Sequence, residues 1–181
     1  MRLGAVALLI ATACFGLGCR GTATSAGTQV DLDHLTFALP AGWQQVPPNS
    51  TMRVAQATIP GPGGPAEMAV FHFGAGQGGS VEANLQRWIS QVVPNAGESA
   101  QRQTFDSGGL RITWVDVRGT LQPGQMGMGP NTAQPNSRLL GAVVEGDGGP
   151  WFFKTTGPDA TLAPQRDAFE AMLHGARPRS G

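Results

Sequence analysis

Both cysteines of this chain, Cys14 and Cys19, lie near its N-terminus, and no cysteine follows them. The sequence after residue 19 therefore contains no disulfide framework and no cysteine-based metal site. A fold in that region has to depend on a hydrophobic core, and the chain is long enough to bury one. Its 27 glycines and 14 prolines cluster at turns and in two loops, which is typical of a globular domain with long loops.

The first 19 residues have the order of a secretory signal peptide. Arg2 supplies positive charge, residues 3–17 form an almost unbroken apolar run, and Gly18 precedes Cys19. The run is shorter than the roughly 20 apolar residues that a transmembrane helix needs. A cysteine directly after a small residue resembles the lipobox of bacterial lipoproteins, which implies cleavage before Cys19 and acylation of its side chain.

Two alternatives to acylation of Cys19 stay open, because the lipobox pattern prefers leucine three positions before the cysteine, where this chain has Gly16. The first alternative is cleavage before Cys14 and acylation of that cysteine, which would leave an apolar stub at the start of the mature chain. An ordinary cleaved signal would discard the cysteines or leave them unused.

We expect three segments along the chain. Residues 1–18 are predicted to be a lipoprotein signal peptide, and residues 19–29, rich in Gly, Thr, Ser and Ala, a flexible tether. Residues 30–178 are predicted to form a single domain. An acyl anchor would hold this domain at a membrane of the bacterial cell envelope, on its extracytoplasmic side, and which membrane is left open.

The charge balance excludes some partners. The chain has 12 basic and 12 acidic residues and therefore lacks the basic face that nucleic acid requires. Every basic residue but one is arginine, and the exception is Lys154. We interpret this bias as base composition rather than as function.

Hydrophobic periodicity predicts the secondary structure. Strands are expected at residues 32–39, 52–59, 67–73, 102–105, 110–121, 138–145 and 151–156. Helices are expected at residues 80–93 and about 161–174, and residues 122–136 show no periodicity and are expected to form a long loop. This order predicts an α+β fold with a mainly antiparallel sheet flanked by two main helices.

The first helix has clear boundary signals. Ser80 can cap it, and Pro94 is expected to close it. Leu85 and Trp88 lie on its apolar face, whereas Asn84 and Arg87 point elsewhere and are expected to be exposed.

Three segments carry a family resemblance: the stretch from Phe37 to Trp43 (FALPAGW), the hairpin from Leu140 (LGAVVE) to Lys154 (WFFK), and the closing amphipathic helix. Together they resemble PsbP-like domains, a family of α/β/α sandwiches. The resemblance covers roughly residues 30–178 and implies a sandwich fold. The family includes bacterial secreted proteins, and its best-known members bind partner proteins. It carries over no functional residue, because no site motif matches.

A glycine-rich segment follows the expected strand at 67–73. Gly74, Gly76 and Gly79 have GxGxxG spacing before the first helix, a pattern that can bring backbone N–H groups close to a phosphate. A dinucleotide fold needs repeated parallel βαβ units, which this chain lacks. A flexible turn or a general anion-binding loop are the alternatives.

Other candidate sites have weak patterns. The pair Met126 and Met128 could bind Cu(I), but methionines in a loop more often form a contact surface. The histidines, His34, His72 and His174, show no ligand spacing. We therefore expect no cofactor and no metal.

The sequence also lacks a recognisable catalytic constellation. There is no GxSxG motif, and paired carboxylates could come only from residues expected to be solvated, namely Asp106, Asp116, Glu145 and Asp147. We therefore expect a protein that is not an enzyme.

The predicted function is noncatalytic binding of a protein or an envelope component through the domain surface. The candidate contacts are the loop residues Gly76, Gly78 and Gly79, the helix residues Asn84 and Arg87, and the loop 122–136. The alternative is a small-ligand carrier or an enzyme that uses a pocket between sheet and helices. A deep apolar cavity with converging polar groups would favour this alternative.

Overall fold

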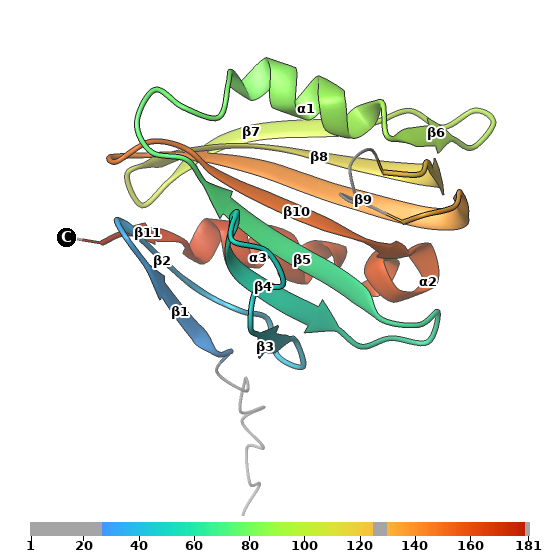
Figure 1. Ribbon diagram of the computed structural model, residues 1–181, viewed down its shortest axis with the longest axis horizontal. Helices are drawn as coiled ribbons and strands as arrows, with labels where there is room; N and C mark the ends of the chain where they lie inside the picture. The colour runs from blue at the N-terminus through green and yellow to red at the C-terminus, as the bar shows by residue number, and fades with distance from the viewer. Residues whose placement is uncertain (1–26, 125–129, 180–181) are drawn as a thin grey trace, which may run out of the picture.

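The computed structural model describes residues 27–124 and 130–179 (Figure 1). Eight of its strands form one antiparallel sheet: β3 (Gln44–Val46), β4 (Arg53–Ile59), β5 (Ala66–His72), β6 (Val92–Pro94), β7 (Gln101–Ser107), β8 (Leu110–Leu121), β9 (Gln134–Glu145) and β10 (Trp151–Pro158). Their order across the sheet is β3-β4-β5-β10-β9-β8-β6, and β7 pairs with the first half of β8. Strand β9 begins inside the predicted loop 122–136, because Leu121 pairs with Gln134.

A small second sheet consists of β1 (Gln29–Leu32), β2 (Leu35–Ala38) and β11 (Arg177–Pro178). The prediction of one strand over residues 32–39 is therefore wrong. The chain reverses at Asp33 and His34, and His34 adopts a φ of 59°, so that Leu32 pairs with Leu35. The reversal buries Val30 and Phe37 together against the main sheet.

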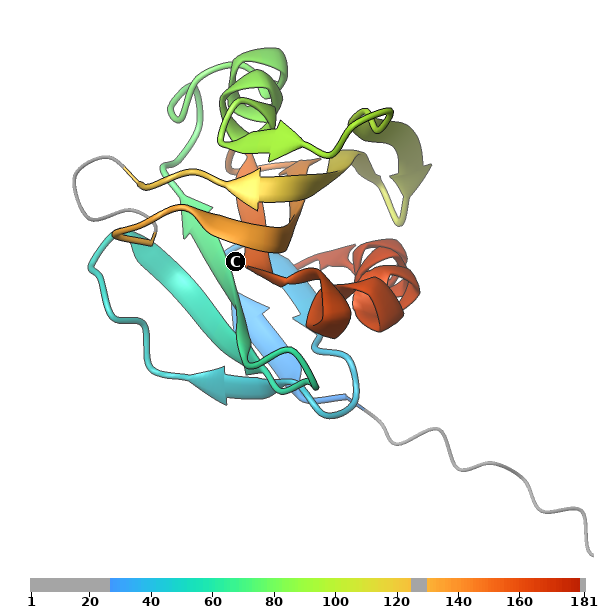
Figure 2. The same ribbon diagram turned by 90° about the vertical axis from the view of Figure 1, so that its right-hand side faces the viewer.

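Helices cover both faces of the main sheet (Figures 1 and 2). Helix α1 (Val81–Ile89) lies on one face, and α2 (Asp159–Leu162) and α3 (Arg166–Gly175) lie on the other. The predicted α+β class, with a mainly antiparallel sheet and two main helices, is confirmed. A 3-10 turn at Ala163–Gln165 divides the predicted final helix, because Pro164 lacks the N–H that a continuous helix needs. No helix within the described ranges is both long and apolar enough to cross a membrane.

Helix α1 begins as predicted and ends early. The hydroxyl of Ser80 accepts a hydrogen bond from the Ala83 N–H at 3.2 Å, which confirms the predicted cap. The helix ends at Ile89, and the prediction that it continues to Val93 and is closed by Pro94 is wrong. Residues 92–94 instead pair with the end of β8, which places the Val92 side chain in the core beneath α1.

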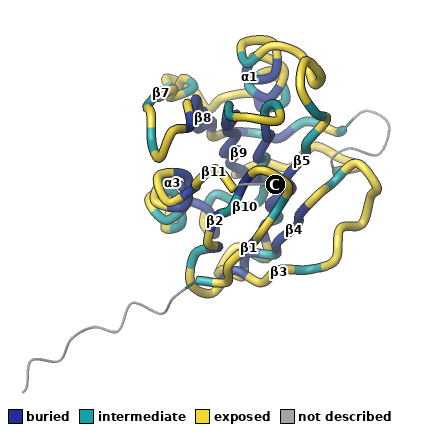
Figure 3. The backbone as a smooth tube through the Cα atoms, turned by 90° about the vertical axis from the view of Figure 1, so that its left-hand side faces the viewer, coloured by how far each residue is buried: buried dark blue, intermediate teal, exposed yellow. Residues whose placement is uncertain are grey.

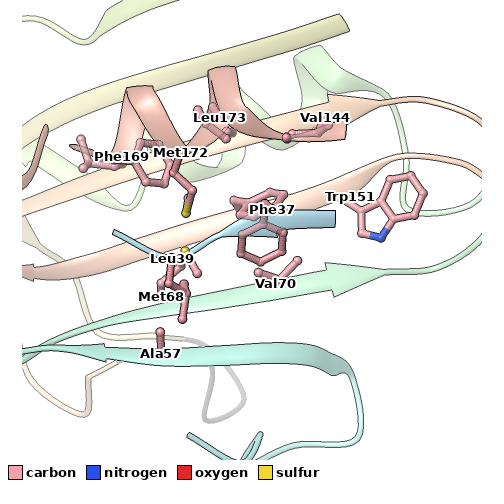
Figure 4. Packing of buried hydrophobic residues seen from close by; sticks show 14 of the residues in the cluster. Phe37, Leu39, Ala57, Met68, Val70, Val144, Trp151, Phe169, Met172 and Leu173 are labelled. Atoms are coloured by element: carbon pink, nitrogen blue, oxygen red, sulfur yellow. The ribbon is translucent and has the colours of Figure 1, made fainter. Parts of the chain in front are cut away.

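Two hydrophobic cores lie on opposite faces of the main sheet. The larger core fills the space between the main sheet, α3 and the small sheet, and Figure 4 shows Phe37 of the small sheet among its residues. Phe37 meets Phe153 edge-on at 5.1 Å between ring centroids. The smaller core lies beneath α1, where Leu85 and Trp88 pack with Val143. The central strands β8, β9 and β10 are the most continuously buried part of the chain (Figure 3).

A buried ion-pair network fastens α3 to the sheet. Asp116, which is 5% exposed, binds Arg138 through two hydrogen bonds, with Nε to Oδ1 at 2.7 Å. Arg166 of α3 approaches Asp116 at 3.4 Å and lies 5.0 Å from the centre of the Trp114 ring. The expectation that Asp116 is solvated is wrong, because its side chain lies on the same face of β8 as Trp114 and points into the larger core.

We predict that Gly141→Val destabilises the smaller core. A Cβ at position 141 would lie 2.5 Å from the ring of Trp88, which is buried, so the ring would have to leave its packed position in the smaller core. Chemical denaturation should show a loss of about 2 kcal/mol in the free energy of unfolding. Gly175→Ala is the control, because a Cβ at position 175 meets nothing within 4 Å. Equal stability of the two variants would contradict this packing.

Candidate functional site

A cleft of about 1590 Å³ opens on the face of the main sheet that carries α1. Helix α1 packs on β8 and β9, and a helix is about 10 Å wide, roughly two strand spacings. The part of this face that belongs to β4, β5 and β10 therefore extends beyond the helix. It forms the floor of the cleft, with α1 and residues 130–137 as walls.

The floor is an ordered grid of side chains, because alternate residues of a strand share a face. Strand β10 contributes Phe152, Lys154 and Thr156 to the cleft in that order. Their partners on β5 are Phe71, Ala69 and Glu67, respectively. The cleft is thus aromatic at one end, cationic in the middle and polar at the other end.

Small neighbours leave room around Lys154. Ala69 pairs with it on one side and Gly141 on the other. The ring of Trp88 packs against Gly141 and also lines the cleft, so it forms the wall beside the lysine. The lysine therefore lies between two neighbours with little or no side chain and next to the Trp88 ring.

The cleft carries more positive than negative charge. Arg53, Arg87 and Lys154 line it together with one carboxylate, that of Glu67. Glu67 already accepts hydrogen bonds from Arg53 at 2.7 Å and from Gln56 at 2.8 Å. Lys154 and Arg87 are left without a carboxylate partner among the described residues.

Lys154 has a pKa that the cleft shifts from its ordinary value. Burial and the charges of Arg87 and Arg53 lower the pKa of Lys154 to about 8, and the carboxylate of Glu67 opposes this shift. Within the described part of the chain, its ammonium has no hydrogen-bond or ion-pair partner. An anion placed between Lys154 and Arg87 could form charge-assisted hydrogen bonds to both cations at once.

The residues predicted to take part in binding divide into two groups. Gly78 and Arg87 line the cleft, whereas Gly76 and Gly79 do not belong to its lining. Gly76 has open space around it, and a Cβ at Gly78 would lie 2.6 Å from the Phe152 ring. Close packing, rather than approach to a phosphate, thus accounts for a glycine at position 78.

The expectation that Asn84 is exposed is wrong, since it is 5% exposed. Its amide group donates hydrogen bonds to the carbonyls of Gly78 at 2.8 Å and Ser80 at 2.9 Å. Its amide oxygen accepts one from Arg87. Asn84 therefore anchors the glycine-rich loop to the helix and positions Arg87.

The GxGxxG segment lies in an antiparallel setting. It connects β5 to α1, and the strand after α1 is β6, which pairs antiparallel with β8. The Ser80 hydroxyl already accepts a hydrogen bond at the N-terminus of the helix. This connection lacks the parallel βαβ unit of a dinucleotide site.

The other candidate residues stand apart from the cleft. His72 stacks on Trp151 and its Nδ1 lies 3.1 Å from the Pro150 carbonyl oxygen, and His174 stacks on Phe105. In residues 27–124 and 130–179, no three His, Cys, Asp or Glu side chains gather closely enough to hold a metal ion. Met126 and Met128 lie outside the described residues.

The candidate carboxylates are not assembled into an acid–base pair with Asp116, whose two oxygens bind Arg138. Asp106 is exposed and contacts Arg111 at 3.4 Å, and Asp147 is exposed at a turn. Glu145 is half-buried, opposite Arg111 in the sheet.

No protein-family model matches the chain, and a search of curated proteins finds no relative of it. The resemblance to PsbP-like domains therefore stays a prediction.

We predict that Lys154→Met raises the free energy of unfolding at pH 7 by about 1 kcal/mol, because it removes an unpaired, partly buried charge. Below about pH 8 the lysine is charged in both folded and unfolded chains, and the full cost of burial is present. Between about pH 8 and 10.5 the folded chain releases this proton first, so the difference from wild type should shrink. Denaturation curves across this range measure it.

Lys154→Arg is the matched control for this pH series. Arginine stays charged over the whole range, so the difference between the Arg and Met variants should remain constant. A constant difference between wild type and Lys154→Met would contradict the lowered pKa of Lys154.

Proposed function

We propose that this protein is a noncatalytic binding protein whose cleft takes an anionic small molecule with an apolar body. The observation that carries the proposal is Lys154, which has no ion-pair partner in residues 27–124 and 130–179, beside Arg87 in a cleft lined by aromatic side chains. A large concave site with a few converging polar groups is the usual form of a small-molecule site. This proposal takes up the small-ligand alternative from the sequence and gives it a location.

The charges of the cleft favour an anion over a neutral or cationic ligand. A cation would meet Arg53, Arg87 and Lys154, and Glu67 is already paired with Arg53. A neutral ligand would leave the Lys154 ammonium desolvated and without a partner. An anion would form charge-assisted hydrogen bonds to Lys154 and Arg87 and would return the pKa of Lys154 toward its ordinary value.

The aromatic side chains favour an apolar body on that anion. The apolar surface left open in the cleft comes from Phe71, which is half-buried, and from Met52 and Phe73, which are 42% and 45% exposed. Phe152 and Trp88 also line the cleft, but they are buried in the smaller core and form its apolar backing. Covering such surface contributes about 25 cal/mol per Å² of apolar area removed from water. Protein docking through the exposed residues 131–136 is the competing proposal, and it makes no use of Lys154.

We further propose that the domain acts at the extracytoplasmic face of a bacterial membrane, held by an acyl group on Cys19. The support is the order of charge, apolar run and Gly18-Cys19 in the sequence. At this location, an amphiphilic component of the cell envelope would be accessible to the cleft as a ligand.

Cys19→Ala should move the protein from the membrane fraction to the soluble fraction, because it removes the predicted acylation site. Cell fractionation followed by immunoblotting measures this. Cys14→Ala is the matched control and should stay in the membrane fraction. Unchanged membrane association of Cys19→Ala would contradict the lipid anchor.

The full chain carrying Cys19→Ala should bind the anionic aromatic dye 1-anilinonaphthalene-8-sulfonate at one saturable site. Lys154→Gln and Arg87→Gln should each weaken binding about tenfold, which corresponds to about 1.4 kcal/mol. Binding should be strongest below about pH 8 and weaken as the lysine loses its proton. Fluorescence titration measures all three effects.

Arg111→Gln is the control, because Arg111 is an exposed cation on β8 that does not line the cleft. It should bind the dye as the parent chain does. Equal affinity of the Lys154, Arg87 and Arg111 variants would contradict the anion site and favour protein docking.

A further inference from the structure

The cationic centre of the cleft has room for ligand on both sides along β10. Phe152 lies before Lys154 and Thr156 after it on the same face, and positions two apart in a strand are about 7 Å apart. A terminal carboxylate bound at Lys154 would fill only one of these sides. A ligand that fills both carries its negative charge in the middle of the molecule, and a phosphodiester is such a group.

The two ends of the cleft differ in chemistry. Phe71 and Phe152 form the aromatic end, next to the half-exposed Phe73. Thr156, Glu67 and Ser137 line the other end, where Asn136 also contributes. The first end fits an acyl chain, and the second fits a group rich in hydrogen bonds.

Glu67 determines what kind of polar group fits the second end. Its carboxylate repels a second acidic group, so the single anionic centre of the ligand belongs at Lys154. An ammonium there would lie near the Arg53 guanidinium, which is 2.7 Å from Glu67. Hydroxyl groups can donate to Glu67 and both donate to and accept from Thr156 and Ser137 without either repulsion.

We propose that the cleft binds a phosphodiester lipid with a hydroxyl-bearing headgroup, its chain along Phe71 and Phe73, its phosphate between Lys154 and Arg87, and its headgroup against Thr156 and Glu67. This inference rests on the proposed function, since it specifies the anionic ligand of the same cleft. The volume of about 1590 Å³ exceeds the 300–1,000 Å³ of sites for drug-sized ligands and is suited to a molecule with a chain, a phosphate and a headgroup.

Four probes test the three parts of this ligand on the full chain carrying Cys19→Ala. They are a short-chain lysophosphatidylglycerol, dodecyl phosphate without a headgroup, dodecyl maltoside without an anion, and glycerophosphoglycerol without a chain, each below its critical micelle concentration. Calorimetric titration should give the tightest binding for lysophosphatidylglycerol. Dodecyl phosphate should bind about five- to tenfold more weakly, and the other two at least a hundredfold more weakly.

Two variants assign the parts to residues. Lys154→Gln should weaken binding of both phosphate-bearing amphiphiles about tenfold and leave dodecyl maltoside unchanged. Thr156→Val, which is close in size, should reduce lysophosphatidylglycerol to the affinity of dodecyl phosphate and leave dodecyl phosphate unchanged. Thermal unfolding of each variant shows whether it is folded, and Thr156→Ser, which keeps the hydroxyl, should retain the affinity of the parent chain.

The failures of the two proposals are distinguishable. Either of two results overturns the headgroup assignment and leaves the anionic cleft standing. One is equal affinity of the parent chain for dodecyl phosphate and lysophosphatidylglycerol. The other is equal affinity of Thr156→Val and the parent chain for lysophosphatidylglycerol. If none of the four probes binds, both the lipid assignment and the proposed function are overturned. Tight binding of glycerophosphoglycerol alone would point to a soluble phosphodiester and would overturn the lipid source.

Discussion

The alternation of side chains along β10 is the constraint on which the rest of this structure depends. Trp151, Phe153 and Thr155 point into the larger core, and Phe152, Lys154 and Thr156 face the cleft. Because β10 lies between β5 and β9, a shift of one residue in its register would move the lysine into the core and an aromatic ring into the cleft. The core residues that fix the register therefore also fix the position of the cationic centre.

The cleft exists because a single helix covers only part of this face of the main sheet. Helix α1 packs on β8 and β9, and its width leaves β4, β5 and β10 to form an open floor. Buried apolar contacts hold the helix itself in place, and Asn84 ties the preceding loop to it. The rigid part of the fold thus supports a face that contains an unpaired charge.

Sequence periodicity predicted much of the fold because most elements bury one face. The strands at β4, β5, β8 and β10, the cap at Ser80, and the buried face of Leu85 and Trp88 follow from local patterns alone. The early end of α1 could not be predicted in this way, since Val92 fits a helical face as well as a strand. The reversal at Asp33 and His34 also carries no glycine that would have marked it.

The candidate site was predicted only in part. Arg87 and Gly78 were predicted to take part in binding and line the cleft, whereas Asn84 proved to be a buried anchor. The sequence does single out Lys154, as the one lysine among arginines and within an apolar strand. Its significance depends on Ala69 and Gly141, which are distant in sequence and become its neighbours only when β5 and β9 pair with β10.

The central claim is that the Lys154 ammonium is partly desolvated, has no ion-pair partner among the described residues, and can take an anion. Because the chain contains one lysine, ¹³C labelling of lysine gives a single Cε resonance whose shift against pH reports this pKa directly. The account predicts a midpoint near pH 8 in the free protein and a higher midpoint when an anionic amphiphile is bound. A midpoint at the ordinary lysine value in the free protein, unmoved by such a ligand, would contradict it.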